Sequence, residues 1–138
     1  SFGVSAKALH PTHNVVVISG DGAFLSGGLS IESAFQDNHP ITIVIDNNGG
    51  LDCISQQQER LFASGKHFAT DFRDIPFHAM CEGLGGHGEL VETREDLAPA
   101  LQRAMASGKV AVVNVKCRGV ISPIVAATSD KRDKASIE

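Results

Sequence analysis

Residues 15–50 read VVVISGDGAFLSGGLSIESAFQDNHPITIVIDNNGG, and this stretch decides the fold class. Two runs within it, Val15–Ser19 and Ile41–Asp46, are rich in β-branched residues and show no alternation of apolar and polar side chains. Such runs are typical of strands that are buried on both faces of a parallel sheet. Apolar residues between the runs recur at helical spacing until Asn38-His39-Pro40, which favours the end of a helix. The stretch therefore predicts a strand, a helix and a second strand.

The rest of the chain continues this alternation. A third apolar run lies at Val110–Val115, and Leu90 with Val91 predicts a short edge strand. A helical pattern covers residues 75–84 and another begins near residue 93. Alternating strands and helices imply right-handed crossovers. We therefore expect an α/β fold that is doubly wound, with a mainly parallel sheet and helices on both faces.

The helix near residue 93 carries two local signals. Thr93 and Asp96 resemble a capping box, in which each side chain bonds the backbone of the other residue. Pro99 lies inside the same pattern, and proline lacks the N–H that a helix interior uses. The sequence predicts a capped helix whose first turn is irregular.

Composition limits the classes of function. The 138 residues fit one core, and the net charge of −4 argues against a basic surface for nucleic acid. No apolar run approaches the roughly 20 residues that span a membrane, and the start does not resemble a signal peptide. The odd cysteine count and the absence of CxxC favour reduced thiols at Cys53, Cys81 and Cys117. We expect a cytoplasmic protein with no nucleic-acid or membrane partner.

The two ends of the chain differ from its middle. Residues 1–11 read SFGVSAKALHP, which is typical of a helix already under way and suggests a piece of a longer protein. Residues 121–138 lose periodicity and end in the charged sequence SDKRDKASIE. We predict a domain over residues 1–120 and a tail or lid over residues 121–138.

Two polar loops follow predicted strands. Gly20-Asp21-Gly22 comes after the first strand and Asn47-Asn48-Gly49-Gly50 after the second. Ligands of doubly wound sheets bind beyond the carboxyl ends of the strands, where both loops are expected. A carboxylate reaches a phosphate only through a cation, and Mg²⁺ prefers hard oxygen ligands such as those of Asp21 and Asn48. Ordinary turn chemistry explains each loop taken alone, so it is their pairing that favours a phosphate site.

The paired loops also carry a resemblance. GDG followed, after one helix and one strand, by NN resembles the signature of thiamine-diphosphate enzymes. Residues 20–50 are similar to the acetolactate synthase-like branch, which includes oxalyl-CoA decarboxylase and 2-hydroxyacyl-CoA lyase, and residues 77–117 are similar to its closing elements. The resemblance implies the diphosphate-binding domain of that family, with its thiamine-diphosphate-binding fold.

The family's roles transfer residue by residue. The resemblance implies that Asp21, the Asn48 side chain and the Gly50 carbonyl bind Mg²⁺, and that Gly22 and Ala23 offer N–H groups to the diphosphate. The implied cofactor-binding residues are Gly20, Asp21, Gly22, Ala23, Asn48, Gly50 and Leu51. Two positions depart from the family: Ala23 replaces a common serine, and Leu51-Asp52 replaces an aromatic-glycine pair that borders the substrate.

The resemblance also implies an activity. It is that of a lyase or transferase which makes or breaks carbon–carbon bonds next to a carbonyl, acting on a 2-oxo acid, an aldehyde or an acyl-CoA. The family activates its cofactor with a glutamate of a pyrimidine-binding domain, in the same or a partner subunit of a homodimer or homotetramer. No residue of this chain is expected to be catalytic, and the chain alone is expected to be inactive.

A second function stays open beside this one. The chain also fits a non-catalytic α/β module whose Asp21 loop binds Mg²⁺ and another phosphate ligand, and which need not use Asn48. The sequence GLGGHG at residues 83–88 does not support a dinucleotide site, because it follows a helical pattern instead of a strand.

Overall fold

The computed structural model describes residues 2–62, 67–120 and 123. They divide into two compact units. Of the described residues, the first unit contains 2–48 and 75–117, and the second contains 49–62, 67–74, 118–120 and 123. The predicted tail at residues 121–138 lies outside the described residues, apart from Pro123.

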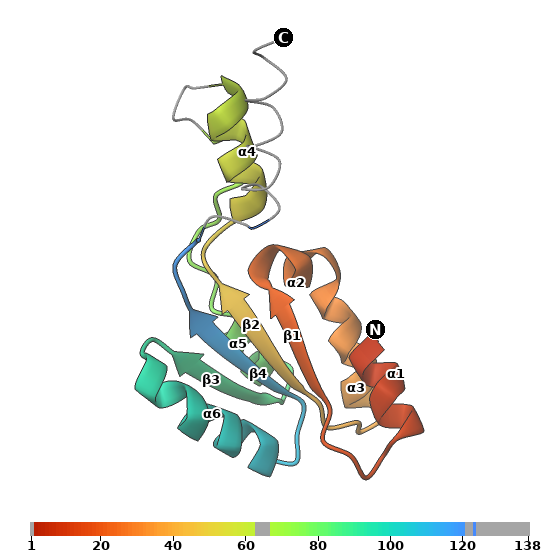
Figure 1. The fold of residues 1–138 in the computed structure, drawn as a ribbon. Coiled ribbons are helices and arrows are strands. Elements are labelled where there is room, and N and C mark those ends of the chain that lie inside the picture. Colours follow the sequence, from red (N-terminus) through yellow and green to blue (C-terminus); the bar gives the residue numbers. More distant parts are fainter. Residues whose placement is uncertain (1, 63–66, 121–122, 124–138) are drawn as a thin grey trace. The chain divides into compact units, whose positions relative to one another are not determined.

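The first unit is built on a four-stranded parallel sheet (Figure 1). The strands, in the order in which they pair, are β1 (Val16–Gly20), β2 (Thr42–Asn47), β4 (Ala111–Lys116) and β3 (His87–Val91). Every neighbouring pair is parallel. Because parallel strands all end at the same edge, the loops after β1 and β2 begin side by side, with Gly20 opposite Asp46.

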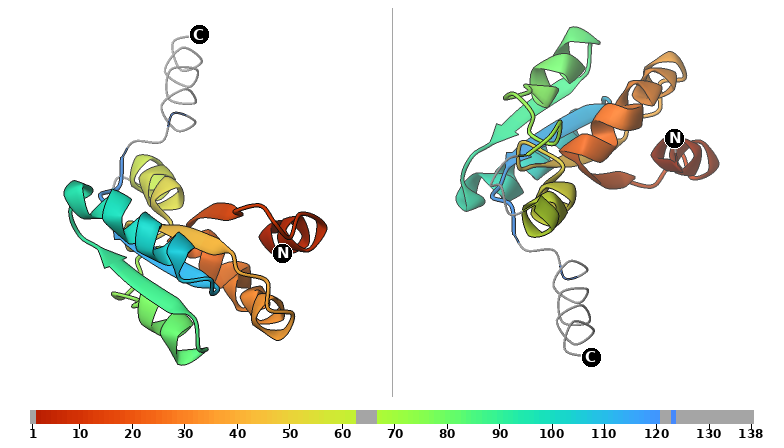
Figure 2. Two further views of the ribbon diagram at one scale, coloured as in Figure 1. Left: turned by 90° about the horizontal axis from the view of Figure 1, so that it is seen from below. Right: turned by 90° about the horizontal axis from the view of Figure 1, so that it is seen from above.

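Helices cover both faces of this sheet (Figure 2). The helices of this unit are α1 (Phe2–Leu9), which lies beyond the β1 edge, α2 (Asp21–Gly27), the 3₁₀ turn η1 (Gly28–Ile31), α3 (Glu32–Gln36), α5 (Phe77–Gly83) and α6 (Arg94–Ala106). One apolar cluster joins α5 and the α2–α3 segment to the sheet, and a second joins α6 to β3 and β4. The expected doubly wound α/β architecture is confirmed.

The larger cluster is organised around two aromatic rings. Phe24 of α2 and Phe77 of α5 meet edge to face, with ring centroids 5.5 Å apart and planes at 87°. Phe77 is 1% exposed and belongs to the same apolar cluster as Ile43 and Ile45 of β2. The pair fixes α2, which begins at Asp21, against the same core as β2.

The prediction that the first strand is buried on both faces is wrong. Ile18 is 80% exposed and Val16 is also exposed, whereas Val17 is half-buried. The reason is that β1 is an edge strand among the described residues, and α6 packs over β3 and β4. One face of β1 therefore presents apolar side chains on the surface.

The prediction of a single helix between the first two strands is also wrong. The segment is divided into α2, η1 and α3, and the break falls at Gly27-Gly28. Glycine weakens a helix through its backbone entropy. A Cβ on Gly28 would lie 2.6 Å from the Phe24 ring, so the glycine that breaks the helix also makes room for the core aromatic residue.

The capping box predicted for the Thr93 helix does not form. The Thr93 Oγ1 donates a hydrogen bond to Asp96 Oδ2 at 2.6 Å, and no cap bond joins a side chain to the backbone. Aspartate is one methylene shorter than the glutamate of a capping box, which limits its reach to the N-cap N–H. The helix α6 is nevertheless continuous from Arg94 to Ala106 with Pro99 inside it, so the expected irregular first turn is absent.

A charged contact ties β3 to α6 and gives a pH prediction. Arg103 donates two hydrogen bonds to Glu89, at 2.9 and 2.7 Å, and these lower the pKa of Glu89 to about 2, with a smaller contribution from His87. Because the pKa falls from its ordinary value of 4.5, the stabilisation is present above that pH and disappears as the pH falls through about 2.

We expect Glu89→Gln to destabilise the protein by about 1 kcal/mol at pH 7, since Arg103 is half exposed and solvent weakens the pair. The loss should shrink as the pH approaches 2. Thermal unfolding from pH 7 to pH 2 checks this, with the exposed Glu92→Gln as the control. If the difference in stability between Glu89→Gln and wild type stayed constant with pH, the ion pair would not be the cause of the destabilisation.

The second unit joins one helix to the segment that follows it. Helix α4 (Asp52–Phe62) holds residues 67–72 through paired hydrogen bonds between Gln58 and the Phe68 backbone, at 2.7 and 3.1 Å. The Ser55 and Thr70 hydroxyls bond at 2.7 Å. Hydrogen bonds to Glu59 and Asp71 raise the pKa of His67. These contacts make α4 and residues 67–72 one substructure.

Two further findings concern the described residues. No helix among them is long and apolar enough to cross a membrane. Cys53, Cys81 and Cys117 all carry free thiols, as the cysteine pattern indicated.

Candidate functional site

Asp21 is the first residue of α2 and directly follows β1. Its side chain lies in a protected position, because the residue is only 3% exposed. The Gly22 N–H donates a 2.6 Å hydrogen bond to Asp21 Oδ1, which orients the carboxylate at the end of the strand. Gly22 is buried and Ala23 is exposed. A carboxylate at the carboxyl edge of a parallel sheet lies where such sheets bind ligands, and its hard oxygens suit a cation such as Mg²⁺.

Asn48 directly follows β2 on the neighbouring strand. The register pairs Gly20 with Asp46, so Asp21 and Asn48 both leave the sheet just beyond the same pair of residues. Asn48 is half-buried. The structure thus brings these two predicted site residues to one edge of one unit.

Gly50 and Leu51 belong to the second unit, where both have backbone partners. Gly50 forms an antiparallel bridge with Asp71, and the Leu51 N–H donates to the Thr70 carbonyl at 2.7 Å. A Cβ on Gly50 would lie 2.6 Å from the Thr70 carbonyl oxygen, and Gly49 has a φ of +82°. Both glycines are therefore required by the backbone of this turn.

The donor atoms fit a magnesium-bridged diphosphate. Asp21 offers carboxylate oxygens and Asn48 a carboxamide oxygen, which are the hard ligands that Mg²⁺ takes, usually few from protein and the rest from phosphate and water. No group of three or more His, Cys, Asp or Glu residues suited to a metal exists in the described part of the chain. A cation at this edge would accordingly depend on a few protein ligands.

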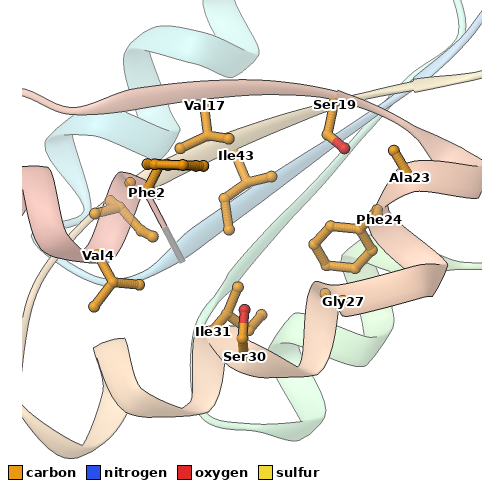
Figure 3. A pocket seen from close by; sticks show the side chains of 13 residues that line it. Phe2, Val4, Val17, Ser19, Ala23, Phe24, Gly27, Ser30, Ile31 and Ile43 are labelled. Atoms are coloured by element: carbon orange, nitrogen blue, oxygen red, sulfur yellow. The ribbon is translucent and has the colours of Figure 1, made fainter.

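A separate hollow lies on the α1–α3 side of β1 (Figure 3). It has a volume of about 400 Å³ and is mostly apolar, with Phe2, Val17, Phe24 and Ile31 in its wall. Ala23 also lines it, whereas Asp21 and Asn48 do not. The hollow is therefore distinct from the proposed cation ligands.

Sequence reasoning missed a buried polar network beside Asn48. Asn47 donates from Nδ2 to Asn114 Oδ1 at 2.9 Å, and Asn114 Nδ2 lies 3.3 Å from His78 Nδ1. Asn114 is 0% exposed. A signal was present in the sequence, because Asn114 is the one polar residue in the apolar run Val110–Val115.

The comparisons with known proteins show the family of the chain. The family described as "Thiamine pyrophosphate enzyme, C-terminal TPP binding domain" matches residues 1–115. The chain belongs to this family, and it is a thiamine-diphosphate-binding domain.

Individual relatives support the assignment. The chain is 37% identical over 115 residues to the probable acetolactate synthase of Mycobacterium bovis, covering 83% of this chain and 21% of that protein. It is 30% identical over 132 residues to the 2-hydroxyacyl-CoA lyase of Arabidopsis thaliana, covering 93% of this chain and 22% of that protein.

A solved structure shows the same likeness. The thiamine diphosphate-dependent 4-hydroxybenzoylformate decarboxylase of Rhodococcus jostii superposes with a TM-score of 0.75 at 28% identity, covering 87% of this chain and 23% of that one. The chain spans about a fifth of the length of the curated relatives it matches.

Proposed function

We propose that this chain holds the diphosphate of thiamine diphosphate through Mg²⁺, with Asp21 and the Asn48 side chain as metal ligands. The observation that carries the proposal is the position of the buried Asp21 carboxylate at the end of β1. The neighbouring end of β2 leads to Asn48. The chain also belongs to a thiamine-diphosphate-binding family. Gly50 follows Asn48 by two residues, and its carbonyl is the third proposed ligand.

The other proposed cofactor contacts come from small residues around Asp21. Gly20, Gly22 and Ala23 keep this edge free of bulky side chains, so that a diphosphate could approach the backbone. Leu51 is proposed as a further cofactor contact. Ala23 has no hydroxyl, so in this chain the diphosphate would be held at that position through the backbone alone.

The proposed activity is that of a lyase or transferase acting at a carbonyl carbon. When bound, the cofactor supplies the carbon nucleophile and the electron sink for such chemistry. The residues of this chain bind and orient it, and the metal ligands offset the charge of its diphosphate. The names of the relatives, which include a synthase, a lyase and a decarboxylase, support 2-oxo acids, aldehydes or acyl-CoA compounds as substrates.

The rest of the active site is proposed to come from a pyrimidine-binding domain of the same or a partner subunit, in a homodimer or homotetramer. Strand β1 is an edge strand among the described residues and exposes Val16 and Ile18, and such an edge can pair or pack with another part of an assembly, which supports this proposal. The free cysteines are in keeping with the cytoplasm as the proposed compartment.

Replacing Asn48 with alanine separates this function from a generic magnesium–phosphate module. We expect Asn48→Ala in the full natural polypeptide to weaken Mg²⁺-dependent binding of thiamine diphosphate by about tenfold or more, because one of few protein ligands is lost. Isothermal titration checks this, with the exposed Asn14→Ala as the control. Unchanged affinity in Asn48→Ala would favour the module that uses Asp21 without Asn48.

A further inference from the structure

The loop that carries Asn48 is fixed to the sheet on both faces. On one face the Cys117 thiol donates to Asp46 Oδ1 at 2.6 Å. Between the two strands the Cys117 N–H donates to the Asn47 carbonyl at 3.1 Å. On the other face Asn47 donates from its side chain to Asn114 Oδ1. The main chain and the side chain of Asn47 are both held, so the peptide that leads to Asn48 leaves the sheet in a defined direction.

Asn114 occupies a position where an apolar residue would be expected. It lies in β4 opposite Ile45 of β2, on the face that carries Val112 and packs against α5. A buried amide without partners costs stability, whereas replacing both members of a buried hydrogen-bonded pair with apolar groups of the same shape can be nearly neutral. Core packing alone therefore does not call for an asparagine at this position.

The network reaches a third element through His78. Asn114 uses its oxygen for Asn47, so its amide N–H must find an acceptor, and His78 Nδ1 on α5 lies 3.3 Å away. In the tautomer that leaves Nδ1 unprotonated, His78 can accept this bond. This bond fixes the rotation of the Asn114 amide, so that the oxygen faces Asn47.

We infer that Asn114, supported by His78, is a positioning residue for the metal ligand Asn48. The inference rests on the proposed function. Asn114 acts through Asn47, which it holds, and touches neither metal nor cofactor itself. Hydrogen-bonded residues behind metal ligands typically contribute about 10- to 100-fold to metal affinity, because they orient the ligands. Asn114 is expected to act at the lower end of this range, since one residue separates it from the ligand.

The test uses Mn²⁺ as a paramagnetic substitute for Mg²⁺ in the full natural polypeptide with saturating thiamine diphosphate. The concentration of free Mn²⁺ is measured by electron paramagnetic resonance, a readout that does not depend on enzymatic activity. We expect Asn114→Val to raise the Mn²⁺ dissociation constant about tenfold. Asn114→Asp keeps an acceptor for Asn47 and should stay within about threefold of wild type, a smaller effect than loss of the contact.

The matched control is Val112→Ala, which lies two residues earlier on the same strand and face and is equally buried. It should lower the unfolding temperature and leave the Mn²⁺ affinity unchanged. Equal loss of affinity in Val112→Ala and Asn114→Val would overturn the inference, because general loosening of the core would then explain both. Wild-type affinity in Asn114→Val would overturn it as well.

If Asn114→Val does not fold, the variant His78→Ala tests the inference in its place. His78 is only half-buried on α5, so this variant is expected to fold. We expect it to weaken Mn²⁺ binding by about threefold, less than loss of Asn114 itself. An unchanged affinity would contradict the inference. If the wild-type protein bound thiamine diphosphate without any metal, this result would contradict the proposed function and therefore also this inference.

Discussion

Asp21→Asn is expected to weaken Mg²⁺-dependent binding of thiamine diphosphate by about a hundredfold or more. The substitution keeps the shape of the side chain and removes its charge. Residues that only support metal ligands already contribute about 10- to 100-fold, so loss of the one proposed carboxylate ligand should cost at least as much. Asp21 is 3% exposed at the carboxyl edge of the sheet, so bulk solvent cannot readily replace it.

The measurement is isothermal titration of the cofactor at several Mg²⁺ concentrations in the full natural polypeptide. The control is Asp37→Asn, which changes an exposed aspartate after α3 by the same chemistry. Asp21 would be excluded as a metal ligand if Asp21→Asn bound the cofactor as strongly as wild type and with the same dependence on Mg²⁺.

Phe77→Ala is expected to destabilise the first unit by about 3–5 kcal/mol, the range for truncating a fully buried aromatic residue. Phe77 is 1% exposed, and its ring meets Phe24 edge to face. The cavity would open between α5 and α2, and α2 begins at Asp21. We therefore also expect weaker cofactor binding in this variant as a secondary effect.

Hydrogen exchange of the core amides, which reports the free energy of opening of the first unit, checks the effect of Phe77→Ala. Phe68→Ala is the control, because Phe68 is 64% exposed and its truncation should change stability by less than about 0.5 kcal/mol. A loss below about 1 kcal/mol in Phe77→Ala would mean that the two rings do not organise this core.

Much of the fold was predictable because local signals agreed with one another. The apolar runs at Ile41–Asp46 and Val110–Val115 became β2 and β4, the two central strands, in which most residues are buried. The run at Val15–Ser19 has the same composition but became an edge strand. The composition of a run predicts that its strand favours burial. The extent of burial depends on which elements pack against the strand in the fold.

The candidate site was predictable in part. The order of strand, helix and strand placed Asp21 and Asn48 at one edge of the sheet, and the register confirms this placement. The roles of these residues as ligands remain predictions. The bond between Asn114 and Asn47 was not predictable, because it joins residues 67 positions apart and depends on the pairing of β2 with β4.

The most direct test of the central claim is a calorimetric titration of thiamine diphosphate into the full natural polypeptide, with and without Mg²⁺ and with ADP as the competing diphosphate. The account predicts binding that requires Mg²⁺ and strongly prefers thiamine diphosphate over ADP. Binding that does not depend on the metal, or that prefers ADP, would contradict it.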